Sequence, residues 1–315
     1  DLSVNLALAL SKQGKRVVLF DGDLALSNAY IMMGLSPKQT LADALEADLP
    51  LKSIITEGPQ GLSLISGGSG LAELMNVTAK TRHRIISSFR ELQAEYDYVI
   101  VGGADAGVFE IAIKYFAAIG ALGNVNAPFD DSREGFVMGE GAGVLILQSE
   151  EKVKEFNSTK HAKLYPVGSA SDAFDLTSPA DDGRGAKIAL DKALRGIDHI
   201  DAVNAHATST PVGDPVEYRV VTDRYPNTPI YAPKSKIGHT LAAAGTLEAI
   251  YSILSMKNKL IPHCQNMVKC SYDVHNVLVK KPTKMIGAGR GLRTLNNSFG
   301  FGGKCAAQVI EVNDD

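Results

Sequence analysis

The sequence predicts an α/β protein with three layers, in which a sheet lies between two layers of helices. Residues 1–101 alternate apolar helical segments with short apolar strands, the pattern of a parallel sheet covered by helices. From about residue 102, glycine-rich turns separate apolar strands, and small residues of this kind let backbones approach closely. No low-complexity linker divides the two parts, so we expect one compact unit.

Individual elements follow from the apolar runs and from the glycines that end them. The first part predicts a helix at residues 4–10, strands at 16–20, 62–65 and 97–101, and a surface helix at 79–96. In the second part, residues 108–119 and 240–256 predict buried helices, the second of them apolar on nearly all sides.

Composition places the chain among ordinary globular proteins. Its 315 residues can bury a sizeable core, and 45% hydrophobic with 21% charged residues is an average composition. A net charge of -3 gives no general attraction to nucleic acid or to anionic membranes. No run reaches the roughly 18 apolar residues that a membrane helix needs. We therefore expect neither nucleic acid nor a membrane as a partner.

Three cysteines bear on the cellular setting. An odd number of thiols and the lack of a signal-like opening segment favour a reducing, cytoplasmic environment. His263, Cys264, Cys270 and His275 are close in sequence, but they lack the paired short spacing of a zinc site. We expect no metal and no cofactor.

Two histidine motifs give the strongest indication of chemistry. His206 lies in NAHATSTPVGD, and His239 lies in KSKIGHTLAAAG. Two neutral imidazoles can direct two N–H donors at one carbonyl oxygen and stabilise the enolate that forms there. Such a site normally has a nucleophile beside it, and the sequence offers no obvious one. A single histidine among small residues is usually a core residue, so a catalytic role for either histidine has to be argued from the wider motifs.

Residues 102–315 resemble the β-ketoacyl-acyl carrier protein synthases, condensing enzymes with a thiolase-like fold. Five segments occur in the family's order and near its spacing: PFDDSREGFVMGEGAGVLIL, SDAFDLTSPADDGRGA, NAHATSTPVGDPVE, APKSKIGHTLAAAGTLEAI and NNSFGFGGKCA. The resemblance implies that His206 and His239 stabilise the thioester oxygen while a malonyl thioester loses carbon dioxide. It also implies acyl carrier protein or a malonyl thioester as the partner.

The same resemblance assigns supporting roles. Lys234 and Glu248 match family residues that organise the catalytic pair, and the alternative is a structural buried ion pair. The apolar run after Gly238 predicts a helix whose N-terminus favours a neutral imidazole at His239.

Other motif residues match substrate-binding positions of the family. The threonines that match those holding the pantetheine arm are Thr208, Thr210 and, more weakly, Thr177. Their alternative role is that of ordinary loop caps. Gly300, Phe301 and Gly302 match a loop that flanks the acyl pocket, where Phe301 gates entry and a backbone N–H faces the oxyanion. The alternative is a turn whose glycines only relieve backbone strain.

The chain departs from the synthase family at the nucleophile. The family's attacking cysteine opens a helix in the first half, whereas residues 1–101 contain no cysteine. Cys305 follows the glycine turn, where we expect it near the pocket but not as an activated thiolate. Asp175 after Phe174 departs from the family's SDAYH pattern, which puts the fit of the family's substrate in doubt.

Residues 1–101 resemble a different family, the deviant Walker P-loop ATPases of the septum-placement, chromosome-partition and flagellar-number type. The matching segments are NLALALSKQGKRVVLFDGDLALSNAYIMMGLSPKQTLADAL, EGPQGLSLISGGSG and YDYVIV. Asp21 and Asp23 match switch aspartates, but Gly102 replaces the metal-side aspartate and no GxxxxGK[ST] loop occurs. Without a phosphate cradle we expect no ATP hydrolysis.

Together the resemblances indicate a chimera joined after Val101, where both families place a buried parallel strand. We expect borrowed strands to replace those of the thiolase-like first half. The first hypothesis is a synthase-like protein that keeps the decarboxylation half-site and does not condense. A catalytically inert hybrid is the alternative, and a nucleotide-binding switch is the third. Homodimers are usual in the synthase family, but the replaced half weakens that expectation.

Overall fold

A computed structural model of the protein describes residues 2–21, 29–47, 49–67, 92, 94–175, 177–285 and 290–313. The chain divides into two compact units. Unit 1 comprises Asp1–Ala104 and Ala142–Lys160, and unit 2 comprises Asp105–Gly141 and His161–Asp315. The expectation of one compact unit is therefore wrong, because each unit has its own sheet and its own buried apolar clusters.

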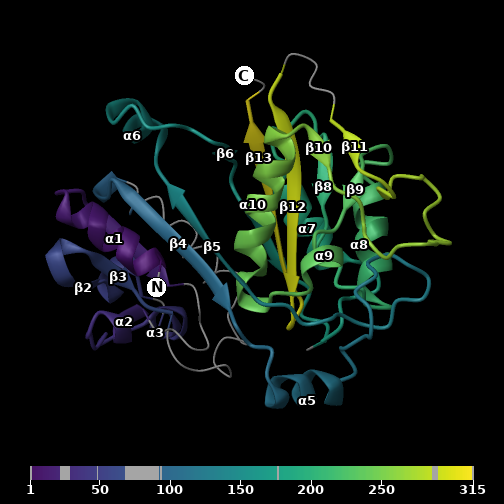
Figure 1. Ribbon diagram of the computed structural model, residues 1–315, viewed down its shortest axis with the longest axis horizontal. Helices are drawn as coiled ribbons and strands as arrows, with labels where there is room; N and C mark the ends of the chain where they lie inside the picture. The colour runs from purple at the N-terminus through teal and green to yellow at the C-terminus, as the bar shows by residue number, and fades with distance from the viewer. Residues whose placement is uncertain are drawn as a thin grey trace. The chain divides into compact units, whose positions relative to one another are not determined.

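Unit 1 is built on a five-stranded sheet in the order β2-β3-β1-β4-β5 (Figure 1). Its strands are β1 (Val17–Asp21), β2 (Thr56–Glu57), β3 (Ser63–Ile65), β4 (Tyr98–Asp105) and β5 (Gly141–Leu147). The strand β1 pairs in parallel with β3 and with β4, which explains why the runs VVLF and YVIV are apolar on both faces. The three predicted strands are confirmed, but β4 continues through Gly102 and Gly103 and ends later than expected.

Short helices surround this sheet. They are α1 (Leu2–Lys12), α2 (Ala29–Met32), α3 (Leu41–Glu46) and α6 (Glu150–Glu155), with the 3-10 turns η1 (Leu51–Ile54) and η2 (Pro59–Gly61). The predicted first helix is confirmed by α1, which buries Val4 and Ala7. Thr40 and Asp43 form a reciprocal capping box that starts α3. The helix predicted at 79–96 lies almost entirely outside the described residues.

Unit 2 is built on a six-stranded sheet in the order β6-β13-β12-β8-β9, with β7 also paired to β13. Its strands are β6 (Lys163–Leu164), β7 (Gly168–Ser171), β8 (Ala202–Asn204), β9 (Ile230–Tyr231), β12 (Leu292–Gly300) and β13 (Lys304–Val312). The strands β10 (Leu260–Ile261) and β11 (Thr283–Lys284) form a separate antiparallel pair. The strands β9, β8 and β12 run in parallel, so their carboxyl ends share one edge of the sheet.

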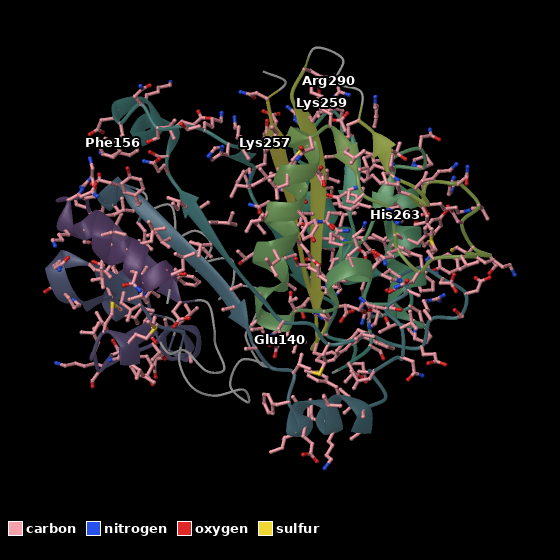
Figure 2. The ribbon with its side chains drawn as sticks, in the orientation of Figure 1. Glu140, Phe156, Lys257, Lys259, His263 and Arg290 are labelled. Carbon is pink, nitrogen blue, oxygen red and sulfur yellow. The ribbon has the colours of Figure 1, made fainter. Side chains whose placement is uncertain are left out.

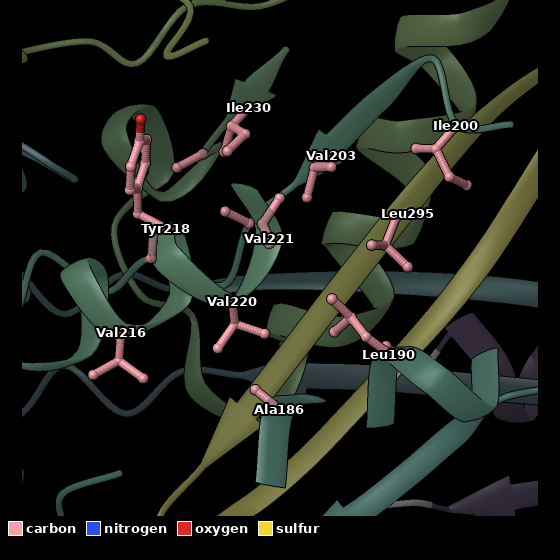
Figure 3. Close-up of a cluster of buried hydrophobic side chains, with 14 of the residues drawn as sticks. Ala186, Leu190, Ile200, Val203, Val216, Tyr218, Val220, Val221, Ile230 and Leu295 are labelled. Carbon is pink, nitrogen blue, oxygen red and sulfur yellow. The ribbon is translucent and has the colours of Figure 1, made fainter. Parts of the chain in front are cut away.

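Helices cover both faces of the unit 2 sheet. The helices of unit 2 are α5 (Glu110–Ala118), α7 (Arg184–Ala193), α8 (Gly213–Thr222), α9 (Lys234–Ile237) and α10 (Ala244–Lys257), with the 3-10 turn η4 (Leu241–Ala243). The cover comes from α7, α8 and α10. Figure 3 shows Leu190 of α7 and Val220 of α8 beside Val203 and Leu295 of the sheet. The helix α10 packs on β12 and β13 from the other face (Figure 1), which gives the predicted three layers.

The end of α10 carries basic side chains, as suits the negative end of a helix dipole. Lys257 lies in its last turn, and Lys259 follows at the same end, far from Glu140 (Figure 2). No helix in the described part of the chain is both long and apolar enough to cross a membrane.

Two helices of unit 2 differ from their predictions. The helix α5 forms as expected, but none of its residues is buried, because it packs mainly through Phe116 against Phe136 and Phe301. The helix α10 begins only at Ala244, and Leu254 on its outer side is 51% exposed. It therefore covers the sheet with one face and is not buried on all sides.

Candidate active site

Parallel strands of unit 2 deliver the predicted residues to one edge of the sheet. His206 follows β8, Lys234 opens α9 after β9, and Gly300 ends β12. The carboxyl ends of parallel strands are the usual position of sites in open α/β sheets. His239 joins them from the loop after α9, where its backbone N–H donates to the carbonyl oxygen of Val137 at 2.8 Å.

The structure brings the two predicted histidines together. The ring centroids of His206 and His239 lie 5.6 Å apart, and the ring planes meet at 85°. Phe136 packs edge-on against His239, and Phe299 lies beside His206. Both imidazoles line the same cavity, so one small molecule could contact both.

Each imidazole is held at its Nδ1 atom. The backbone N–H of Leu241 donates to Nδ1 of His239 at 3.2 Å, from a residue with a φ of 41°. Nζ of Lys234 lies 3.3 Å from Nδ1 of His206, and an ammonium group can only donate. A neutral imidazole that accepts at Nδ1 carries its proton on Nε2. The site therefore has two Nε2–H donors.

Burial keeps both imidazoles neutral. It lowers the pKa of His239 to about 3, with a smaller contribution from the charge of Lys234. Burial and the neighbouring Lys234 and His239 lower the pKa of His206 well below 6.5. The helix N-terminus predicted to keep His239 neutral lies farther along the chain, since α10 begins at Ala244, and burial is the main cause instead.

Lys234 and Glu248 form a buried ion pair beneath His206. Each side chain is 1% exposed, and Nζ of Lys234 donates directly to Oε1 of Glu248. Burial raises the pKa of Glu248 to about 7, against the opposing effect of the lysine charge. Because Lys234 contacts both Glu248 and His206, the same pair can stabilise the fold and orient the imidazole.

The sequence interpretation missed Glu217 on α8. Its carboxylate accepts the N–H of His206 at 2.9 Å and the N–H of Ala207 at 2.8 Å, and Asn297 donates to it at 2.9 Å. Ala207 has a φ of 23°, a strained backbone conformation, and these hydrogen bonds stabilise it. Burial raises the pKa of Glu217. The available signal was the Asp214–Glu217 spacing, which puts two acidic side chains on one helix face.

A cavity of about 500 Å³ opens onto the histidines. Its aromatic lining consists of Phe116, Phe136, Phe299 and Phe301. Neither Phe116 nor Phe136 was predicted. Phe116 reaches the cavity from α5, and Phe136 packs between Phe116 and His239. Asp214 also lines the cavity, and burial raises its pKa to about 7.

The three predicted threonines all line the cavity. The hydroxyl oxygens of Thr208 and Thr210 lie 3.3 Å apart, and Thr210 also accepts the N–H of Gly213. Thr177 donates to Asp175 at 3.0 Å. These hydroxyls therefore cap local turns and face the cavity as well, so the two roles are compatible.

The glycine turn between β12 and β13 also reaches the cavity. Gly300 and Phe301 line it, and Phe301 is 43% exposed. Gly302 adopts a φ of 72° and Gly303 a φ of 64°, a region that favours glycine. A side chain at Gly303 would meet Oδ1 of Asp172 at 1.8 Å, so the turn requires glycine there.

Cys305 lies in the cavity wall, 8% exposed. Its Sγ atom lies 3.7 Å from the carbonyl oxygen of Gly303. Among the lining residues that the structure describes, it is the one cysteine.

The predicted nucleotide remnants lie in unit 1. Asp21 ends β1 and accepts the N–H of Ala29 at 3.1 Å, while Asp23 lies outside the described residues. Within the described ranges, no three His, Cys, Asp or Glu side chains are grouped to hold a metal ion.

A three-layer α/β fold with paired imidazoles at the ends of parallel strands defines a thiolase-like protein. Residues 161–268 match the family model for the β-ketoacyl synthase C-terminal domain, and residues 83–153 match that for the N-terminal domain. The chain therefore carries β-ketoacyl synthase domains and belongs to that family.

Curated relatives agree with this assignment. The mitochondrial 3-oxoacyl-[acyl-carrier-protein] synthase of Arabidopsis thaliana is 34% identical over 250 residues, covering 72% of this chain and 53% of that protein. The 3-oxoacyl-[acyl-carrier-protein] synthase 2 of Rhizobium meliloti (strain 1021) is 34% identical over 231 residues, covering 68% and 54%. The chain thus spans about half the length of these relatives.

Solved structures share the fold. The ishigamide ketosynthase/chain length factor has a TM-score of 0.70 and 24% identity, covering 95% of this chain and 75% of that chain. A β-ketoacyl synthase from Burkholderia phymatum STM815 has a TM-score of 0.69 and 23% identity, covering 98% and 81%. At these identities the likeness concerns the fold alone.

Proposed function

We propose that this protein binds a malonyl thioester and decarboxylates it, but does not condense the product with an acyl group. The observation that carries the proposal is the pair of Nε2–H donors of His206 and His239 in one cavity, each fixed through its Nδ1 atom. Two such donors aimed at one oxygen stabilise the negative charge of an enolate more than they stabilise the neutral carbonyl of the ground state.

The proposed step breaks one carbon–carbon bond and transfers one proton. The bond between the carboxylate carbon and the α-carbon breaks, carbon dioxide leaves, and the electron pair moves onto the thioester oxygen as an enolate. The imidazoles donate hydrogen bonds to that oxygen and keep their protons. A proton from water then reaches the α-carbon and gives an acetyl thioester. No protein nucleophile is needed for this step.

Condensation requires more, because an acyl group must first move to a protein thiolate. Residues 1–101 contain no cysteine, and we assign no activated thiolate role to Cys305. In this proposal the threonines Thr177, Thr208 and Thr210 hold the pantetheine arm, and Phe301 controls entry to the pocket. Acyl carrier protein is the proposed carrier of the thioester, as the names of the curated relatives suggest.

One experiment separates decarboxylation from condensation. Malonyl-acyl carrier protein is incubated with the protein, with and without an acyl-acyl carrier protein, and the products are resolved by mass spectrometry. We expect acetyl-acyl carrier protein in both reactions and no 3-ketoacyl product. A 3-ketoacyl product would refute the absence of a nucleophile, and no acetyl product above background would favour the inert hybrid.

We also propose that the segment before residue 102 descends from the P-loop ATPase family and replaces part of the synthase first half. The parallel β3-β1-β4 arrangement and the position of Asp21 at the end of β1 support this origin. Residues 83–153 match the β-ketoacyl synthase N-terminal domain, so in this proposal the change of ancestry lies before residue 83 and not at residue 101, where the sequence suggested it. A cytoplasmic location remains part of the proposal, supported by the three cysteine thiols.

A further inference from the structure

The loop at residues 206–214 supplies one wall of the cavity, and Thr208 and Thr210 belong to that wall. Its backbone is strained, because Ala207 has a φ of 23° and Ser209 has a φ of 65°. Strained residues persist only where the surrounding contacts determine their conformation. The contacts of this loop therefore decide where the two threonine hydroxyls lie.

A second segment, residues 127–133, holds this loop. The N–H of Ala127 donates to Oγ of Ser209 at 2.9 Å, and the N–H of Phe129 donates to Oδ2 of Asp214 at 2.8 Å. Both bonds are buried, where a hydrogen bond is electrostatically stronger than it is in water. The loop is therefore tied to the second segment at both Ser209 and Asp214.

Arg133 ends the second segment and binds the backbone of the loop. Its Nε atom donates to the carbonyl oxygen of Thr210 at 3.0 Å, and its Nη2 atom donates to that of Pro211 at 2.8 Å. Its Nη1 atom donates to the carbonyl oxygen of Asp130 at 2.8 Å, and Cζ lies 5.1 Å from the ring centroid of Tyr272. Each nitrogen of the planar guanidinium thus binds a carbonyl oxygen, an arrangement that a single ammonium group does not reproduce.

The sequence explains why the loop needs this donor. The carbonyl oxygens of Thr210 and Val212 each accept an N–H from four residues farther on, but only at 3.5 Å. The carbonyl oxygen of Pro211 has no such donor, because the residue four positions on is Pro215, which lacks an N–H. Arg133 therefore satisfies carbonyl groups that the start of α8 leaves weakly bonded or without a helical donor.

We propose that Arg133 is a positioning residue, which fixes Thr208 and Thr210 where their hydroxyls receive the pantetheine arm. The inference rests on the proposed function, in which these threonines hold that arm. Arg133 is not one of the described residues that line the cavity, so it acts through the backbone of the loop. The two hydroxyl oxygens lie 3.3 Å apart, so one shift of the loop displaces both.

Isothermal titration calorimetry with acetyl-pantetheine tests the proposal, because this thioester carries the arm but has no carboxylate to lose. Its binding is measurable whether or not the protein decarboxylates malonyl thioesters. We expect Arg133→Lys to weaken binding about tenfold, because one ammonium group does not hold the carbonyls of Thr210 and Pro211 together. The matched control Arg224→Lys lies outside the cavity in an exposed ion pair with Asp191, and it should bind like the wild type.

Combined variants separate positioning from a general effect on the fold. In a Thr208→Val/Thr210→Val background the hydroxyls are gone, so adding Arg133→Lys should weaken binding by less than about twofold. Ser209→Gly is a second variant if Arg133→Lys fails to fold. Glycine keeps the φ of 65° but lacks the hydroxyl that binds Ala127, so we again expect binding about tenfold weaker, and little further loss in the same background.

The possible results lead to different conclusions. No binding of acetyl-pantetheine by the wild type would overturn the proposal, and so would equal binding by the wild type and Arg133→Lys. A tenfold loss that persists in the Thr208→Val/Thr210→Val background would also overturn it, because Arg133 would then not act through the threonines. Binding that depends on Arg133 without any decarboxylation of malonyl-pantetheine would support the positioning role and reject the proposed chemistry alone.

Discussion

The two Nε2–H donors depend on what holds each Nδ1 atom. For His239 it is the backbone N–H of Leu241, which no substitution except proline removes. For His206 it is Lys234, whose own position depends on Glu248. The site thus has one donor fixed by backbone geometry and one fixed by a buried ion pair, and the second is the more vulnerable to mutation.

Both imidazoles should stay neutral well into the acid range. We expect long-range ¹H–¹⁵N spectra to report the Nε2–H form of His206 and His239 from about pH 8 to about pH 5, because burial lowers both pKa values, that of His239 to about 3. A titration midpoint near 6.5 for either ring would contradict the buried site.

The pH dependence of the free energy of unfolding tests the low pKa values of the two histidines independently. Below about pH 6.5 the unfolded chain takes up protons at these imidazoles and the folded chain does not, so they lower the free energy of unfolding as the pH falls. The buried Asp214 and Glu248, with pKa values raised to about 7, act in the opposite direction between about pH 4 and 7, where the unfolded chain loses these protons first and the free energy of unfolding falls as the pH rises. His239→Phe should therefore lose less stability than the wild type on acidification, by up to about 1.4 kcal/mol per pH unit.

Substitutions in the Lys234–Glu248 pair should affect the free energy of unfolding and the rate of decarboxylation differently. Lys234→Met leaves a buried carboxyl without its partner and should lower the free energy of unfolding by about 3 kcal/mol, as measured by urea denaturation. Adding Glu248→Leu should recover most of that loss. Decarboxylation should stay impaired in both variants, because His206 has lost its Nδ1 donor. Recovery of activity in the double variant would assign the pair a purely structural role.

At these positions the motifs predicted more than composition or periodicity could. His206, His239, Lys234 and Glu248 are brought together as the resemblance implied. Glu217 was missed because it binds backbone N–H groups of the His206 loop, so its spacing from Asp214 marked it in the sequence but no partner residue did.

At the scale of elements, the turn between β12 and β13 brings Phe301 and Cys305 to the cavity. Its two left-handed glycines have different surroundings. A side chain at Gly302 would reach only Cε of Lys304 at 4.0 Å, whereas one at Gly303 would collide with Asp172. The turn therefore tolerates change at one position and not at the other.

Paired substitutions test this difference. Gly302→Ala should cost about 1 kcal/mol, from backbone strain alone. Gly303→Ala adds a collision and should cost about 1–3 kcal/mol more. Urea denaturation of both variants measures the difference, and equal losses would show that the close approach of Asp172 is not rigid.

Element type was easier to predict than element environment. Apolar runs located β1, β3 and β4 in unit 1, because a buried parallel strand needs such a run. The same apolar composition misplaced α5 in the core, since composition does not say whether another element covers a helix. For α10, the 3-10 turn at Leu241–Ala243 delayed the start of the helix in a way that no residue pattern marked.

At the scale of the molecule, the two units contain different candidate ligand-binding residues. The cavity and its histidines belong to unit 2, whereas Asp21 belongs to unit 1. The sequence showed a change in composition near residue 101, from which we nevertheless expected one compact unit. It did not indicate that Ala142–Lys160 returns to unit 1, because that return depends on β5 joining β4 in the first sheet.

Calorimetry with Mg-ATP tests the remaining nucleotide hypothesis. We expect no binding by these 315 residues at micromolar concentrations, because Gly102 stands where the metal-side aspartate would follow YDYVIV. Micromolar binding would instead revive a nucleotide-dependent role for the unit that contains Asp21.

The rate of acetyl-acyl carrier protein formation from malonyl-acyl carrier protein decides whether the paired imidazoles do chemistry. It should be compared among the wild type, the double variant His206→Ala/His239→Ala and His161→Ala, a matched substitution of an exposed histidine outside the cavity. We expect the wild type and His161→Ala to form product at the same rate, and the double variant to be at least about a hundredfold slower. Equal rates for all three proteins would contradict the assignment of the site.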